Sequence, residues 1–334
     1  MEGSRLKSIL LAGLILGFVA FSFLSYAIYN LLTQPMLSSN QSPVTLVVDK
    51  KTSAAVLVKQ LESRQLIQRG YLLLALIRVQ GLAHKLKAGI YQITPGESAL
   101  QFLYRVKSGQ VLVKSFRITE GTSLQQVISN LQNEEYLSVH PSDWQGIAEN
   151  KGNPEGLFLA DTYHYDAGSE AKSLLKFAHQ KLAQYLEMQW ATRSENLPYK
   201  NSYELLIVAS ILEKESALPM EKKIISGVVA NRIRKNMPLQ MDPTVIYALG
   251  DKYSGKLKHE DLRIDSPYNT YRYRGLPPTP IAMVGREAIE AAAHPMLSDY
   301  LYFVAKGDGS HHFSATYDEQ KKAIFKYFNK RRQA

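Results

Sequence analysis

Residues 205–216 read LLIVASILEKES, the strongest local pattern in the second half of the chain. From Leu205 to Leu212 every residue except Ser210 is apolar, so a helix here must be buried on all sides. Glu213 follows at the edge of that buried segment. A carboxyl group in such a position loses hydration, which is expected to raise its pKa and keep its proton on at neutral pH. The position therefore suits a general acid.

The same segment also has a structural interpretation. Helix ends rich in charge are common, and Glu213-Lys214-Glu215 could be the solvated end of a core helix. In that case Glu215 or Glu221 would pair with nearby lysines. The motif alone leaves both interpretations open.

Helical patterns dominate the chain around this segment. We predict helices at 172–188, 203–217, 221–236, 243–249, 287–293 and 317–328. The loops between them are dense in Tyr, Pro, Gly and Asn, and strands are expected at 300–304 and near His312. We assign residues 138–334 to a mixed α/β domain.

The N-terminal region carries a different signal. Residues 9–32 contain no charged side chain, and Arg5 and Lys7 stand just before them. As a helix this stretch would be about 36 Å long at ~1.5 Å per residue, enough to cross a hydrocarbon core of ~30 Å. We predict a single transmembrane helix at 9–32, with residues 1–8 in the cytoplasm and the rest on the periplasmic side of the cell inner membrane.

A cleaved signal peptide is the alternative, since Ser25-Tyr26-Ala27 loosely resembles a cleavage site. The apolar stretch is long for a signal peptide, which favours a retained anchor. Gly13 and Gly17 form a G-x-x-x-G pattern that can pack helices into a weak homodimer, although such pairs are common by chance.

Three strand–turn–helix units follow a polar linker at 33–43 that contains two prolines. Their strands are predicted at 44–48, 89–93 and 113–118. Each unit places a serine where a helix N-cap belongs, at Ser53, Ser98 and Ser123. We assign residues 44–137 to one small α+β region, so the whole chain is of the α+β class.

The middle unit, LKAGIYQITPGESALQFLYRVKSGQ at 86–110, resembles a LysM-type module. That family implies glycan binding. A scaffold that only spaces the second domain from the membrane fits the same pattern, because likeness of fold does not establish function. Both interpretations stay open.

Composition narrows the function less than these patterns do. The formal net charge of +10 fits nucleic acid, anionic lipid or an acidic polymer as a partner. No helix-turn-helix, zinc-finger or RNP pattern occurs in the sequence, so we expect no nucleic acid partner. His164, His294, His311 and His312 lack the spacing of a zinc site, and we expect no metal and no cofactor. Cysteine is absent, which fits either redox compartment.

Several long segments, in the same order, resemble the endolytic murein transglycosylase family of YceG-like proteins. The matching stretches are EGLFLADTY at 155–163, ASILEKES at 209–216, NRIRKNMPLQMDPTVIYALG at 231–250, SPYNTYRYRGLPPTPIAMVGREAIEAAAHP at 266–295 and YLYFVAKGDGSHHFS at 300–314. The resemblance implies cleavage of the MurNAc–GlcNAc bond of peptidoglycan glycan strands to leave 1,6-anhydroMurNAc ends, which would terminate or trim nascent strands. It carries the role of catalytic acid/base to Glu213. It also implies penicillin-binding proteins or an elongation complex as partners.

Five residues in these segments are expected to bind substrate: Gln240, Asp242, Tyr268, Asn269 and Tyr271. Gln240 offers a donor and an acceptor to sugar hydroxyls or an N-acetyl group, and the tyrosine rings offer flat faces to a sugar. Asn269 could hold a substrate carbonyl or orient Glu213. Each also has a structural alternative: Asp242 as a helix cap, Gln240 as a loop brace and the tyrosines as half-buried core residues.

The implied reaction needs a single carboxyl group. Glu213 would protonate the glycosidic oxygen and then take the proton of the muramoyl 6-hydroxyl as it attacks C1 of its own sugar. Two other functions compete with this one. A murein hydrolase would need a second carboxylate, which Glu215 or Asp242 could supply. A wall-binding scaffold of the synthesis machinery would use Glu213 only structurally. Members of the family have also been labelled aminodeoxychorismate lyases, a role that does not suit an exported chain.

Overall fold

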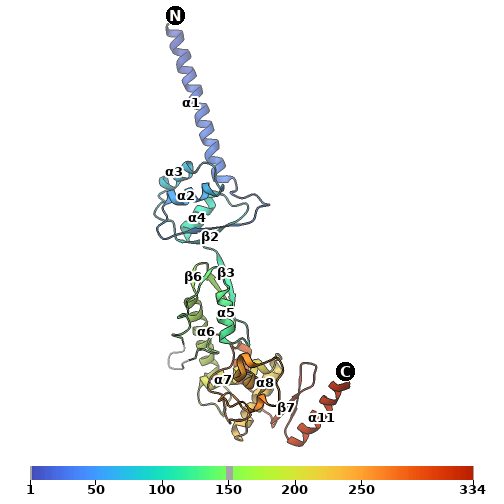
Figure 1. Cartoon of the computed structure of the whole chain (residues 1–334). Helices are drawn as coiled ribbons and strands as arrows, with labels where there is room; N and C mark the ends of the chain where they lie inside the picture. Colours follow the sequence, from blue (N-terminus) through green and yellow to red (C-terminus); the bar gives the residue numbers. More distant parts are fainter. Residues whose placement is uncertain (1, 148–152, 334) are drawn as a thin grey trace. The chain divides into compact units, whose positions relative to one another are not determined.

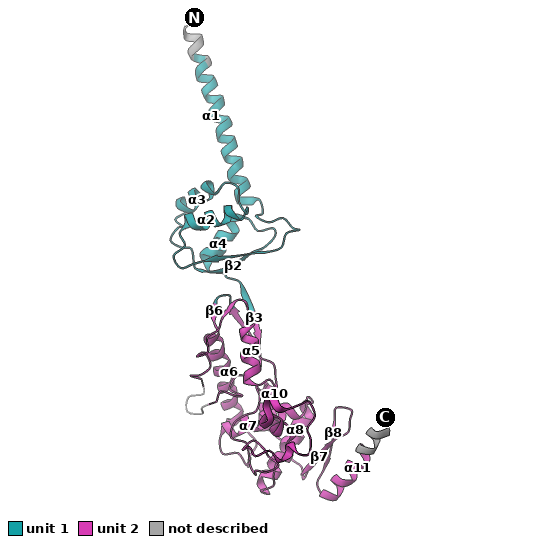
Figure 2. Cartoon of the chain, in the orientation of Figure 1, with its two compact units in different colours: residues 1–114, 166–168 teal, residues 115–165, 169–334 magenta. Residues whose placement is uncertain are grey.

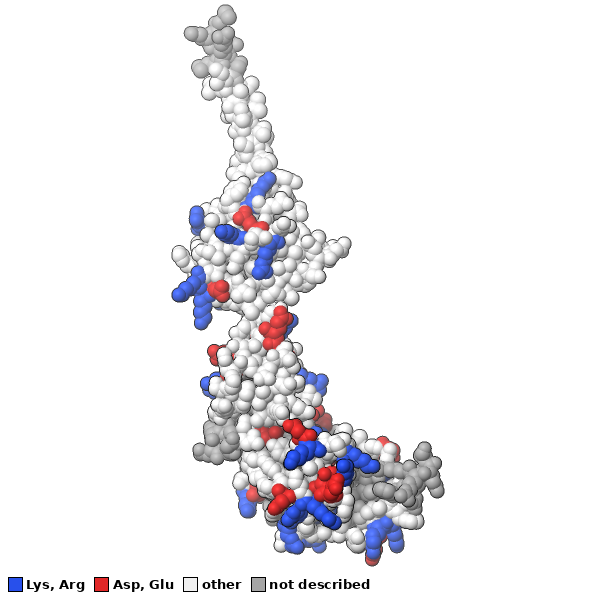
Figure 3. Space-filling model, viewed as in Figure 1, with Lys and Arg blue, Asp and Glu red and all other residues white. Residues whose placement is uncertain are grey.

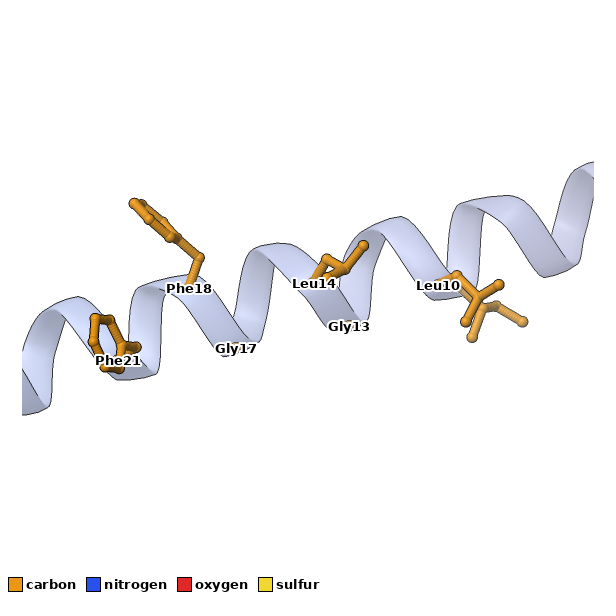
Figure 4. A pocket seen from close by; sticks show the side chains of 7 residues that line it. Leu10, Gly13, Leu14, Gly17, Phe18 and Phe21 are labelled. Atoms are coloured by element: carbon orange, nitrogen blue, oxygen red, sulfur yellow. The ribbon is translucent and has the colours of Figure 1, made fainter.

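The first element is α1 (Glu2–Thr33), which confirms the helix expected near the N-terminus (Figure 1). Its segment Ile9–Thr33 is long and apolar enough to cross a membrane and fits a single-pass membrane protein. Gly13 and Gly17 leave a shallow hollow on this helix, bordered by apolar side chains (Figure 4). A Cβ added at either glycine would meet nothing within 4 Å, so no described residue fills the hollow.

The computed structural model describes residues 2–147 and 153–333, so that Met1, residues 148–152 and Ala334 lie outside the described part. It separates into two units (Figure 2). Unit 1 comprises residues 1–114 and 166–168, and unit 2 comprises residues 115–165 and 169–334. The division thus falls inside the third predicted strand, after Lys114, whereas the sequence placed a domain boundary after residue 137.

Unit 1 is built around an antiparallel pair of strands, β1 (Val44–Val48) and β2 (Gly89–Ile93), with Val44 opposite Ile93. Its three short helices are α2 (Ala54–Ser63), α3 (Gly70–Val79) and α4 (Ala99–Ser108). Ser53 and Ser98 cap α2 and α4 by accepting backbone N–H bonds, as predicted. One face of each helix is buried against the strand pair, which makes a separate hydrophobic core for this unit.

The first part of unit 2 contains two small sheets. One pairs β3 (Val113–Arg117) with β5 (Thr162–Asp166), and the other pairs β4 (Leu137–Ser138) in parallel with β6 (Ser169–Glu170). Helix α5 (Leu124–Gln132) is capped by Ser123, again as predicted. Its residues Val127 and Leu131 pack in one core with Phe116, Phe158 and Leu175. This shared core explains why the third strand–helix segment belongs to unit 2.

The rest of unit 2 is mainly helical. Its elements are α6 (Ala171–Ala191), α7 (Ser202–Glu215), α8 (Pro219–Arg234), α9 (Asp242–Leu249), α10 (Arg286–Ala293), β7 (Tyr302–Ala305), β8 (His311–Ser314) and α11 (Tyr317–Gln333). Helix α7 is central and contacts α6, α8, α9 and α10. Residues 205–212 are at most 3% exposed, which confirms the burial on all sides predicted from the sequence. The charged residues 213–215 form the last turn of α7, at the edge of this core.

Candidate active site

Glu213 lies in the last turn of α7 and has two firm partners. Its Oε1 is 2.6 Å from Nζ of Lys222 on α8, and its Oε2 accepts a 2.8 Å hydrogen bond from the backbone N–H of Gly285. The side chains of Glu213 and Lys222 are 4% and 5% exposed. The buried carboxyl group of Glu213 thus has an oppositely charged group beside it.

This arrangement ties three helices together. Gly285 is the N-cap of α10, so Glu213 joins the end of α7 to α8 and to the start of α10. A Cβ at Gly285 would come within 2.3 Å of Oε1 of Glu120, which explains the glycine at this close approach. Both oxygens of Glu213 already accept from donors of the protein, whereas a general acid has to present a proton to a substrate. The two contacts suit the structural interpretation of Glu213, and its catalytic role stays a prediction.

Glu215, two residues further along α7, has the opposite surroundings. A step of two residues turns about 200° round a helix, so Glu215 leaves the side that faces Lys222. Its Oε2 is buried, and among the described residues it has no hydrogen-bond partner. Burial, together with the nearby charge of Asp242, raises the pKa of Glu215 to about 7. A buried carboxyl group that keeps its proton near neutral pH is what a general acid requires.

Asp242 and Tyr271 lie close to Glu215. Asp242 is the exposed first residue of α9, and the N-cap of that helix is Met241, so Asp242 is not the cap that the sequence allowed. Its Oδ1 instead accepts a 2.5 Å hydrogen bond from the hydroxyl of Tyr271. Burial raises the pKa of Tyr271, and the hydrogen bond to Asp242 and the charges of Asp242 and Glu215 raise it further. The structure thus brings two of the predicted substrate-binding residues together, beside Glu215.

Gln240 is exposed on the loop before α9, and its side chain accepts a hydrogen bond from a buried arginine. Arg232 donates through Nη1 to Oε1 of Gln240 at 3.2 Å and to the carbonyl of Leu239 at 2.9 Å. The backbone N–H of Gln240 donates to the carbonyl of Thr270 at 3.1 Å, which joins this loop to the loop of Tyr271. Gln240 is therefore both a brace and an exposed amide, and the two interpretations offered for it do not exclude each other.

Asn269 does not face the site. It is fully buried, and its Nδ2 donates to the carbonyls of Leu262 and Ile264 at 3.0 and 2.8 Å. Its Oδ1 accepts from the backbone N–H of Tyr271 at 3.0 Å. With all of these groups used inside its own loop, Asn269 neither holds a substrate carbonyl nor orients Glu213, and that expectation is corrected. Its contribution is to fix the backbone that carries Tyr271.

Tyr268 belongs to the core more than to the site. Its hydroxyl shares a 2.7 Å hydrogen bond with Thr279, and its ring centre lies 4.8 Å from that of Tyr247. The residue packs against the hydrophobic core around α7. These contacts fit the half-buried structural alternative, and Tyr268 supports the neighbouring ring of Tyr247.

The chain segment directly after Glu215 is also fixed in place. Ser216 donates through its hydroxyl to Oε2 of Glu221 at 3.2 Å and accepts from the N–H of Leu218 at 3.1 Å. Glu221 in turn accepts from the backbone N–H of His311 at 2.8 Å, and its Oε2 lies 2.7 Å from Nδ1 of the same histidine. Strand β8 therefore holds the end of α7 that carries Glu215.

Unit 2 also has a cavity of about 700 Å³, whose lining does not include Glu215, Asp242 or Tyr271. Its lining includes Lys214 and Pro243, the chain neighbours of Glu215 and Asp242, together with the ring of Tyr247. Glu155 also lines it, with Oε1 accepting from the N–H of Leu124 at 2.9 Å, and burial raises the pKa of this carboxyl group. The volume is typical of ligand sites, and the lining combines apolar, amide and carboxyl groups.

Sequence reasoning did not select Glu155 as a site residue, although it begins one of the quoted segments. The available signal was a charged residue two positions before the apolar run Leu157–Ala160. Charged residues before apolar runs are common at the surface as well, so only the fold distinguishes the two cases.

Comparison with known proteins places this fold in a family. The model of the YceG-like family matches residues 46–326, and the chain belongs to that family. A Bacillus subtilis (strain 168) protein named endolytic murein transglycosylase is 29% identical over 322 residues, which cover 89% of this chain and 88% of that protein. A Streptococcus pneumoniae (strain R6) protein of the same name is 24% identical, and the match covers 88% of this chain but 60% of the longer relative.

A solved structure agrees with the family assignment. The crystal structure of a yceG-like protein from Listeria monocytogenes matches with a TM-score of 0.53 and 27% sequence identity. The match covers 85% of this chain and 100% of that chain. The resemblance seen in the quoted motifs is therefore confirmed at the level of both sequence and fold.

Proposed function

We propose that this chain is an endolytic murein transglycosylase that cleaves the MurNAc–GlcNAc bond of peptidoglycan and leaves 1,6-anhydroMurNAc ends. The observation that carries the proposal is the buried carboxyl oxygen of Glu215, which has no hydrogen-bond partner in the described part of the chain and lies beside Asp242 and Tyr271. The names of the two bacterial relatives agree with this activity. We further propose Glu215, in place of Glu213, as the acid/base.

The reaction needs one carboxyl group that acts twice. Protonated Glu215 gives its proton to the glycosidic oxygen while the bond from that oxygen to C1 of the muramoyl sugar breaks. The muramoyl 6-hydroxyl then attacks C1, and its proton passes to the carboxylate of Glu215, which restores the starting acid. No water is consumed, because the nucleophile belongs to the substrate. The protein supplies orientation and proton transfer.

The neighbours of Glu215 set its protonation state and bind the substrate. The charge of Asp242 helps to keep the proton on Glu215, and Tyr271 holds Asp242 in position through its hydroxyl. Gln240, held by Arg232, presents its amide to a sugar hydroxyl or N-acetyl group. The cavity lined by Lys214, Pro243 and the ring of Tyr247 accommodates further sugars of the strand.

The product identifies the reaction class. Mass analysis of sacculi digested by the purified full chain should show muropeptides with 1,6-anhydro ends. Reducing ends in their place would assign a two-carboxylate hydrolase, since Asp242 stands next to Glu215 as a second carboxyl group. If no muropeptides were released while the protein still bound sacculi, the wall-binding scaffold would be the better description.

The pH dependence of the rate should follow Glu215. Because the acid form starts the reaction and the pKa of Glu215 is about 7, kcat/KM should fall about tenfold per pH unit on the alkaline side of pH 7. In Asp242→Asn the negative charge that raises this pKa is absent, so the alkaline limb should move to lower pH. Rates of muropeptide release between pH 5 and 9 measure the alkaline limb of the unchanged protein and that of Asp242→Asn.

Asp299→Asn is the matched control, since this exposed aspartate lies outside the cluster around Glu215. It should leave the limb in place. An alkaline limb that does not move in Asp242→Asn, or that moves to higher pH, would contradict the proposed coupling between the two carboxyl groups.

We propose that α1 anchors the chain in the cell inner membrane with the N-terminus in the cytoplasm. The basic residues Arg5 and Lys7 before the apolar segment support this orientation. Digestion by protease added to spheroplasts tests it, since protection of both units would reverse the orientation. Penicillin-binding proteins or an elongation complex, and a weak homodimer through Gly13 and Gly17, stay predictions about partners.

A further inference from the structure

We propose that unit 1 docks on the bilayer that α1 enters, with α3 in the headgroup layer and Arg69 at the headgroup of an anionic phospholipid. The inference rests on the proposed membrane anchorage and adds a lipid-binding surface to it. Three independent observations lead to it: the depth at which unit 1 meets α1, an amphipathic cavity at that depth and an unusual exposed face of α3.

The first observation is the position of unit 1 along α1. The guanidinium carbon of Arg69 lies 5.1 Å from the centre of the Phe23 ring, and Ala27 of α1 is already 5% exposed. At ~1.5 Å per residue, Phe23 precedes the last residue of α1, Thr33, by about 15 Å. A hydrocarbon core of ~30 Å that starts at Ile9 takes up roughly 20 residues and ends near Ile28. Phe23 precedes Ile28 by five residues, or about 7 Å, so Arg69 lies within about 7 Å of this edge of the hydrocarbon core.

The second observation is a cavity of about 380 Å³ at the same place. Its apolar lining includes Phe23 and Ala27 from α1 and Leu66 and Ile67 from the segment between α2 and α3, and its polar lining includes Asn30 from α1 and Gln68 and Arg69 from that segment. The cavity therefore offers both apolar and polar groups, as a site for the acyl chain and headgroup of a phospholipid needs. The planar guanidinium group suits the phosphate.

The N-terminus of α3 does not itself form the site. The N–H of Gly70 donates to Oε1 of Glu62 at 2.7 Å, so that the helix start is already occupied by a carboxylate. The proposed contact to phosphate rests on the side chain of Arg69, the residue just before α3.

The third observation concerns the outer face of α3. The helix itself lies beside the lower part of α1 in Figure 1. Tyr71 and Val79 are 69% and 87% exposed and share this face with Ala75, at steps of four residues. A helix face in water would be expected to carry polar residues here, whereas Tyr and apolar residues suit a membrane interface. The exposed Arg78 stands beside them and can reach headgroups while its stem stays in the apolar layer.

The charge of unit 1 selects the partner. Residues 34–114 contain eleven Lys and Arg against three Asp and Glu, so this segment carries a net charge of +8 out of +10 for the chain. Basic side chains are spread over the visible face of this unit in Figure 3. A second copy of the chain would bring the same positive charge and repel, and an acidic polymer would use the charge but not the apolar face of α3. Anionic lipid uses both the charge and the apolar face.

The chain contains no cysteine, so single labelling sites can be introduced without background. Tyr71→Cys and Val79→Cys report on the outer face of α3, and Val113→Cys, 56% exposed on β3, is the control within the same unit. The full chain, labelled with an environment-sensitive fluorophore, is reconstituted in vesicles of phosphatidylcholine with about one third phosphatidylglycerol. Labels at 71 and 79 should be quenched by spin-labelled lipid and shielded from aqueous iodide, and the label at 113 should behave in the opposite way.

The charge argument is tested by matched variants. Arg69→Gln and Arg78→Gln should each lower the ratio of docked to undocked unit 1 by about fivefold, the effect expected for one basic residue at an anionic surface. Lys107→Gln removes the same charge from the far end of α4, whose first residue Ala99 lines the cavity, and should change the ratio by less than about twofold. Vesicles of phosphatidylcholine alone should lower docking of the unchanged protein.

Three results would overturn the proposal. If the labels at 71 and 79 are as accessible to iodide as the label at 113, unit 1 is not docked. Shielding that disappears when the protein is diluted in lipid would assign the face to a second copy of the chain. Release of the unchanged protein by alkaline carbonate would show that α1 does not span the bilayer, and the anchorage would fail together with the docking. The muropeptide assay tests the proposed enzymatic activity independently of these three results.

Discussion

Glu215→Gln should lower the rate of glycan cleavage by about 10² to 10⁴-fold while the protein stays folded. Glutamine keeps the size of the side chain but cannot donate a proton to the glycosidic oxygen or take one from the muramoyl hydroxyl. Among the described residues Oε2 of Glu215 has no protein partner, so the substitution breaks no hydrogen bond there. Release of anhydro-muropeptides from sacculi, with circular dichroism as the control for folding, measures the effect.

The same variant should be more stable than the unchanged protein at alkaline pH. The pKa of Glu215 is raised from 4.5 to about 7 in the folded state, so the folded protein binds this proton more tightly than the unfolded chain does. Stability from this source is complete below pH 4.5 and is lost as pH rises through 7. At pH 8 the free energy of unfolding of Glu215→Gln should exceed that of the unchanged protein by up to about 3 kcal/mol.

Unfolding measured at pH 5 and pH 8 in detergent checks the sign. A gain in stability that appears only at pH 8, combined with lost activity, is the signature of a carboxyl group kept protonated for catalysis. A variant that is destabilised equally at both pH values would mean that Glu215 is a structural residue, and full activity in Glu215→Gln would remove it from the mechanism.

The sequence allowed the helix α7 to be predicted but not the roles of its two terminal glutamates. The burial of residues 205–212 follows from their apolar character, and the serine N-caps follow from local turn chemistry. The partners of Glu213 come from elsewhere: Lys222 from the next helix and the N–H of Gly285 from 72 residues away. No local pattern encodes that contact, so the identity of the desolvated and unpaired carboxyl group became visible only in three dimensions.

Other differences between the predicted and the observed structure also arise from surroundings that no local sequence pattern encodes. Asn269 was expected to face a ligand because its amide suits one, but the loop folds so that the amide bonds its own backbone. Helix α3 was not predicted, since the run GYLLLALIRV is apolar almost throughout and shows no clear alternation between buried and exposed residues. The periodicity rule assumes that the outer face of a helix meets water. An apolar outer face, as on α3, suits a helix that meets a membrane instead.

Glu213→Gln should destabilise unit 2 by about 3 to 5 kcal/mol, the typical cost of removing one partner from a buried ion pair. Glutamine has one acceptor oxygen for two donors, so either the ammonium of Lys222 or the N–H of Gly285 would be left facing an amide NH₂ group. The side chain of Lys222 is 5% exposed and cannot turn to water without disturbing the contact of α7 with α8. Activity should fall only as far as the folded fraction falls.

A second substitution separates a structural from a catalytic Glu213. In the double variant Glu213→Gln, Lys222→Met the unpaired buried charge is gone, so much of the lost stability should return, and activity at low temperature should return with it. Thermal unfolding of the two single variants, the double variant and the unchanged protein completes the cycle. If the double variant folds well but releases no anhydro-muropeptides, Glu213 transfers the protons after all, and the assignment of the acid/base to Glu215 fails.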